Sequence, residues 1–195
     1  MTPIQVLHRR AKVDPEGVAF AAGGRNWSYA WLAGQSERVA RGLAARGLRK
    51  GDRVVLHMPN RPELAVGLYA CFHMGAVAVP LNHRLETASL GPIFQRLRPA
   101  FYLGDRKRYS LVEPIDSSIV AKERRFIAGQ PGEDSRLQHW ESLLSNDASV
   151  SLPVASDIHS PAVLLATLES TGVKCFTHTH ATLTALFGLP FLCGQ

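Results

Sequence analysis

The segment between residues 29 and 103 alternates three times between a helical pattern and a short apolar strand pattern. Such alternation with short connections requires parallel strands, because each helix returns the chain to the same edge of a sheet. The sequence therefore predicts an α/β fold in which parallel-sheet layers carry flanking helices. The predicted helices span residues 29–46, 60–75 and 87–97, and the predicted strands span residues 53–58, 76–79 and 100–103.

Polar residues and glycines mark the ends of these elements. We expect Ser28, Asn60 and Thr87 to cap the three helices, because short polar side chains accept hydrogen bonds from free amides of a first turn. Gly75 is expected to end the second helix. Glu63, in the first turn of that helix, is explained by the helix dipole rather than by acid–base catalysis. A first helix after Thr2, followed by strands at residues 18–22 and 25–28, precedes the alternating region.

Composition restricts the possible partners. The chain has 195 residues and a net charge of +6, but its basic residues are scattered in pairs and not interleaved with aromatic residues, so we expect no nucleic-acid partner. The longest apolar stretch, residues 64–80, is short for a membrane span and contains His73. Three cysteines without metal-ligand spacing, and no signal-peptide pattern, predict a soluble cytoplasmic protein without a metal site. Cys71, in an apolar run, is expected to be a small buried hydrophobe.

The C-terminal segment contains the most informative polar cluster. A predicted strand at residues 162–168 leads into a turn, and we expect Thr177 or Thr179 to open a final helix. Hydroxyls, turn amides, a lysine and a helix N-terminus could together bind phosphate, although a Ser-Thr-Gly turn taken alone is more often only a turn. The candidate phosphate-binding residues are Thr167, Ser170, Thr171, Gly172 and Lys174.

These motifs give the chain a resemblance to the N-terminal region of adenylate-forming (AMP-binding) ligases of the acyl-CoA synthetase type. The phosphate-loop residues above are similar to that family's Thr-Ser-Gly-Thr-Thr-Gly-x-Pro-Lys-Gly loop, and Thr179-His180 is similar to the pair that follows it. Residues 27–32, 48–63, 75–85 and 140–144 resemble further family segments in the correct order. The resemblance implies that residues 1–160 form an N-terminal α/β subdomain. Residues 161–195 would then form a strand, the phosphate loop and the start of the following helix.

The same resemblance implies an activity and its cofactors. In that family the loop holds the β- and γ-phosphates of ATP with magnesium, a carboxylate attacks the α-phosphate, and a thiol such as coenzyme A takes the acyl group. Fatty acid metabolism is the implied context. The family's adenine, ribose and magnesium contacts lie beyond the matched segments, so the sequence identifies no catalytic residue and no acyl pocket.

Three residues depart from the family loop. Leu168 and Glu169 replace its Ser-Gly pair, and Cys175 replaces the glycine after the lysine. A carboxylate about 4 Å from a phosphate charge is repelled by about 1 kcal/mol in water and by more in a drier site. We therefore expect the chain alone to be non-catalytic. The alternatives are a non-catalytic interaction or dimerisation module, one piece of a split or longer ligase, and a nucleotide-binding module without chemistry. A truncated domain should also expose an apolar face for self-association or for the missing ligase segments.

Overall fold

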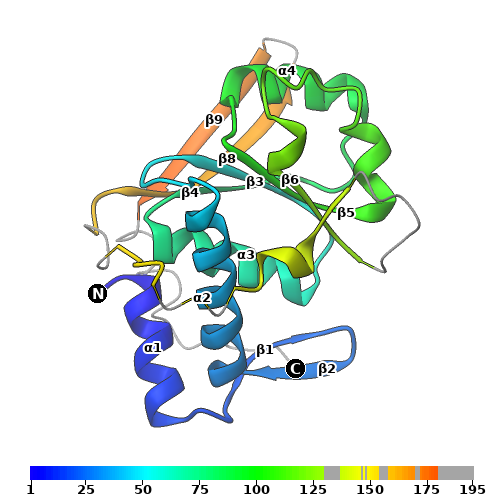
Figure 1. Ribbon diagram of the computed structural model, residues 1–195. Coiled ribbons are helices and arrows are strands. Elements are labelled where there is room, and N and C mark those ends of the chain that lie inside the picture. The colour runs from blue at the N-terminus through cyan, green and yellow to red at the C-terminus, as the bar shows by residue number, and fades with distance from the viewer. Residues whose placement is uncertain (130–136, 146, 148, 154–157, 170–171, 180–195) are drawn as a thin grey trace.

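The computed structural model describes residues 1–129, 137–145, 147, 149–153, 158–169 and 172–179, with only the backbone described for residues 167–169 and 172. A seven-stranded sheet forms the centre of the molecule, and helices cover both of its faces (Figure 1). The α-helices are α1 (Pro3–Val13), α2 (Tyr29–Ala45), α3 (Pro62–Met74) and α4 (Thr87–Leu97). The 3-10 helices are η1 (Arg106–Leu111), η2 (Lys122–Arg124) and η3 (Trp140–Leu143).

The central sheet is parallel except at one edge, which confirms the predicted parallel α/β architecture. Its strand order is β7-β6-β5-β3-β4-β8-β9, and only β8 and β9 pair antiparallel. A separate antiparallel hairpin, β1–β2, precedes α2. The strand bounds are β1 Val18–Ala22, β2 Arg25–Ser28, β3 Arg53–His57, β4 Val77–Pro80, β5 Phe101–Asp105, β6 Arg125–Ala128, β7 Gln138–His139, β8 Pro161–Glu169 and β9 Gly172–Thr179.

Both faces of the central strands are buried, and successive residues alternate between two cores. In β3, Val54 and Leu56 join the core formed with α1, α2 and α3, whereas Val55 joins the core formed with α4. Phe101 and Tyr102 of β5 divide in the same way. A parallel sheet covered on both faces has continuous apolar strands for this reason.

Two predicted helix caps are wrong by one residue. Arg61, not Asn60, is the N-cap of α3, because Pro62 is the first helical residue and a residue before proline is held in extended conformation; ψ of Arg61 is 162°. Glu86, not Thr87, is the N-cap of α4, and Thr87 is its first helical residue. Neither residue makes a side-chain hydrogen bond to the free amides of its own helix. Ser28 caps α2 as predicted, because its Oγ accepts a hydrogen bond from the Trp31 amide.

The C-terminal segment corrects a third prediction. Thr177 does not open a helix: it lies inside β9, which pairs with β8 from Pro161↔Thr179 to Glu169↔Gly172. β-Branched and aromatic residues favour this extended conformation. Thr179 is the last residue of β9, and the predicted helix beyond it lies outside the described residues. Within the described residues, no helix is both long and apolar enough to cross a membrane.

Candidate phosphate-binding hairpin and neighbouring sites

The predicted phosphate-binding residues lie at the far end of the β8–β9 hairpin. Thr167 and Lys174 are Cα partners in the ladder, and Glu169 is the partner of Gly172. Ser170 and Thr171 connect the two strands and lie outside the described residues. The hairpin thus brings three of the five predicted residues to one end of a β-ribbon.

Strand pairing changes how this segment could bind an anion. Most phosphate loops that precede a helix use its free N-terminal amides, but from Gly172 to Thr179 the chain is a strand. Lys174 is exposed and remains a possible source of positive charge. Any binding of phosphate in the described part of the segment must therefore use side chains and amides of the ribbon itself.

One face of the hairpin is packed against the core and the other is exposed. Leu164, Ala166 and Val173 pack against the core that contains α4. On the other face Leu165 and Phe176 are Cα partners and remain 43% and 57% exposed. Two large apolar side chains side by side form an exposed apolar site of the kind expected for a partial domain.

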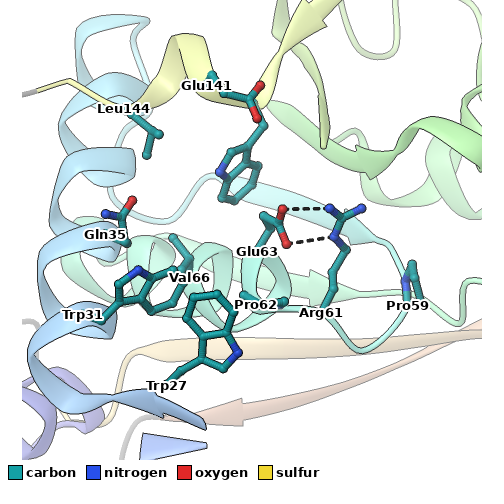
Figure 2. Close-up of a pocket in the computed structure, with 11 residues that line it drawn as sticks. Trp27, Trp31, Gln35, Pro59, Arg61, Pro62, Glu63, Val66, Glu141 and Leu144 are labelled. Atoms are coloured by element: carbon teal, nitrogen blue, oxygen red, sulfur yellow. Dashed lines mark hydrogen bonds and ion pairs between the residues drawn. The ribbon is translucent and has the colours of Figure 1, made fainter. Parts of the chain in front are cut away.

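A cluster of charged residues surrounds the start of α3. The sequence analysis did not predict this cluster as a site. The Arg61 guanidinium donates two hydrogen bonds to the Glu63 carboxylate, at 2.7 and 2.8 Å (Figure 2). It donates a third to Asp105 at 2.6 Å. These carboxylates raise the pKa of Arg61 above its usual value, and Glu63 has the larger effect. Glu63 is thus held by a specific ion pair as well as by the helix dipole. The Arg-Pro-Glu sequence at residues 61–63 was the available signal.

Burial shifts the pKa values of three titratable groups elsewhere towards their neutral forms. Burial lowers the pKa of His57 and of His73 to about 4, and raises that of the Cys71 thiol to about 12. His73 Nε2 lies 3.4 Å from Ser36 Oγ, and His57 Nδ1 lies 3.2 Å from the Tyr102 hydroxyl. His57 Nε2 has no hydrogen-bond partner within the described residues. Cys71 is completely buried, which confirms its interpretation as a small hydrophobe.

Curated relatives of this chain include several acid–CoA ligases. A feruloyl-CoA synthase from Amycolatopsis is 45% identical over 82 residues, covering 42% of this chain and 17% of that protein. A 2-succinylbenzoate–CoA ligase from Bacillus subtilis is 34% identical over 122 residues, covering 60% of this chain and 25% of that protein. A long-chain-fatty-acid–CoA ligase from Mycobacterium tuberculosis is 28% identical over 188 residues, covering 91% of this chain and 35% of that protein. The matched part of the chain therefore covers only 17–35% of these relatives' length.

Solved ligase structures share the fold. A putative long-chain-fatty-acid CoA ligase from Rhodopseudomonas palustris superposes with a TM-score of 0.85 at 21% identity, over 95% of this chain and 46% of that one. Coronafacic acid ligase from Pectobacterium brasiliense superposes with a TM-score of 0.80 at 26% identity, over 94% of this chain and 36% of that one. The family described as AMP-binding enzyme matches residues 7–190, nearly the whole chain. This chain belongs to the AMP-binding enzyme family.

Proposed function

We propose that this chain contributes the N-terminal part of an ATP-dependent acyl-CoA synthetase, in which a carboxylate is first adenylated and then transferred to a thiol. The CoA ligases among its relatives support this reaction class. The long-chain-fatty-acid–CoA ligase supports a role in fatty acid metabolism. A cytoplasmic location agrees with the odd number of cysteines and the buried Cys71 thiol.

The pairing of Thr167 with Lys174 is the observation that carries this proposal. It sets a hydroxyl residue and a lysine opposite each other at the end of the hairpin, with Ser170 and Thr171 between them in sequence. Hydroxyl and ammonium donors are suited to the charged oxygens of a triphosphate. In the proposed function these residues would hold the β- and γ-phosphates of ATP, and magnesium would neutralise part of the phosphate charge.

We also propose that the chain alone does not catalyse this reaction. Glu169 places a negative charge in the segment that would bind ATP, next in sequence to Ser170. At about 4 Å the repulsion is about 1 kcal/mol in water, which corresponds to about a fivefold loss of affinity. The chain also spans less than half of the solved ligases that it matches, so further segments are expected to supply the rest of the site.

Pyrophosphate exchange tests both parts of the proposal. The purified chain is incubated with ATP, magnesium and a panel of fatty and aromatic acids, and incorporation of labelled pyrophosphate into ATP is measured. We expect none for the chain alone. Fusion of residues 1–179 to the corresponding remainder of the mycobacterial ligase should restore exchange. Glu169→Gly in that fusion should lower the KM for ATP about fivefold. Exchange by the chain alone would disprove its inactivity, and a folded but silent fusion would contradict the proposed role.

The exposed apolar pair on the hairpin favours a second role as an interaction module. We propose that Leu165 and Phe176 contact either a second copy of the chain or further ligase segments, because exposed apolar neighbours are stabilised by burial. Sedimentation velocity distinguishes these partners. Self-association should weaken in Phe176→Ser but not in the control Val13→Ser, whose side chain is 73% exposed at the end of α1. A chain that is monomeric at all concentrations would exclude the second copy.

A further inference from the structure

A cavity of about 480 Å³ lies between α2, α3 and η3, on elements other than the β8–β9 hairpin. Its volume falls in the range of small-molecule sites, about 300–1,000 Å³. All three tryptophans of the chain line it, together with Arg61 and two glutamates. Figure 2 shows Trp27, Trp31, Glu63 and Glu141 around this space.

The tryptophans Trp27 and Trp31 form an angled aromatic wall. Their ring centroids are 4.3 Å apart and their planes are tilted by 47°, so the rings present two differently oriented π surfaces. The Arg25 guanidinium already lies over the Trp27 ring, 5.0 Å from its centroid. The contact shows that the Trp27 ring takes part in a cation–π interaction, and an indole face is the strongest aromatic partner of positive charge.

The charge around the cavity is opposite in sign to that of the whole chain. Among its lining residues, Glu63 and Glu141 contribute −2 and Arg61 contributes +1, which leaves −1. Two further charges touch the lining residues: Asp105 accepts a hydrogen bond from Arg61, and Arg25 lies over the Trp27 ring. They cancel, so the local charge stays at −1. The complete chain carries +6. An aromatic cavity with local negative charge in a basic protein selects for positively charged ligands.

We propose that this cavity binds a small organic cation of the alkylated-ammonium class. Such a cation is weakly hydrated, so its transfer from water to the indole faces of Trp27 and Trp31 costs little, while the carboxylate of Glu141 supplies long-range attraction. The Arg61–Glu63 ion pair fixes the opposite wall. The inference is independent of the proposed ligase reaction, because none of its residues belongs to the phosphate-binding hairpin.

Choline and its neutral isostere 3,3-dimethylbutan-1-ol test the proposal on the purified chain. Because all three tryptophans line the cavity, the indole emission of the protein reports directly on its occupancy. We expect choline to change the emission saturably, and the alcohol to need at least about tenfold higher concentration for the same change. Equal responses to both would overturn the proposal by showing a merely apolar pocket. The absence of a saturable response to choline would also overturn it.

Matched variants separate the aromatic and charge contributions, with binding followed by line broadening of the choline methyl protons. Trp31→Leu should weaken binding about 3- to 30-fold, as expected for the loss of one cation–π contact. Glu141→Gln should weaken it about two- to fivefold. The control Glu123→Gln, an exposed glutamate of η2 outside the cavity, should leave binding unchanged. Unchanged binding in both cavity variants, or an equal loss in the control, would refute the assignment of the site.

Discussion

Gly42 allows helix α2 to lie directly against η3, and its replacement gives a sharp test of the packing around the aromatic cavity. A methyl group at Gly42 would overlap the carbonyl oxygen of Leu143 and lie 2.7 Å from the carbonyl carbon. Because these are backbone atoms, no rotamer change relieves the overlap, and η3 must move away from α2. That movement disturbs Leu143 and Trp140, which are 0% and 4% exposed.

The expected cost of Gly42→Ala follows from three opposing contributions. Overpacking costs about 1–3 kcal/mol, and partial exposure of Leu143 adds about 1 kcal/mol. Replacing glycine by alanine inside a helix returns about 1 kcal/mol. The net expectation is a destabilisation of about 2 kcal/mol.

Gly34 provides the matched control in the same helix. It is exposed, and a methyl group there would meet nothing within 4 Å. Gly34→Ala should therefore stabilise the protein by about 0.5–1 kcal/mol. Urea unfolding followed by circular dichroism gives both free energies, and tryptophan emission reports on any movement of Trp140. If Gly42→Ala is as stable as Gly34→Ala, the proposed close contact between α2 and η3 is refuted.

Two further predictions concern buried polar groups. The Arg125 guanidinium donates hydrogen bonds to the carbonyls of Val112, Ile115 and Val120. Arg125→Met should therefore lower the free energy of unfolding, measured in urea, by about 3–5 kcal/mol. A change below about 1 kcal/mol would show that these bonds are not needed for stability. The pKa of His73 is lowered to about 4 in the folded state from 6.5, so the unfolded chain binds more protons between these values. The stability that the neutral His73 imidazole contributes is therefore complete above about pH 6.5 and is lost as the pH falls towards 4. The free energy of unfolding should fall by at most about 1.4 kcal/mol per pH unit in this range. His73→Leu should reduce this dependence of the free energy of unfolding on pH. An unchanged slope would show that His73 is not responsible.

The strands of the central sheet were predictable because consecutive residues in them are apolar. Residues such as Val54, Val55 and Leu56 are all apolar, since the first and third face one core and the second faces the other. Helices α2 and α4 each bury one apolar side, whereas α3 is buried on all sides near its C-terminal end. Element types between residues 29 and 103 were therefore predictable. Asn60 failed as a cap because a local effect, the steric demand of Pro62, shifted the boundary by one residue.

The aromatic cavity was not predictable in the same way. Trp27 ends up beside Trp31 through the junction of β2 with α2, and η3 adds Trp140 from a distant part of the sequence. No periodic pattern links residues that meet only through tertiary packing. The ion pair between Arg61 and Glu63 was closer to prediction, because the two residues are neighbours around a proline that fixes their relative position.

The hairpin that carries the proposed phosphate-binding residues is joined to the rest of the sheet over a short length only. β4 ends at Pro80, and its ladder to β8 contains the single pair Ala78↔Val163. Beyond Val163 the hairpin continues as a two-stranded ribbon, a structure of low intrinsic stability unless one face is packed. Contact with the α4 core supplies that packing on one side, while Phe176 on the other side remains exposed. The stability of the proposed phosphate-binding end is therefore expected to rise when the open face is covered, and this would couple the proposed partner binding to the proposed ATP binding.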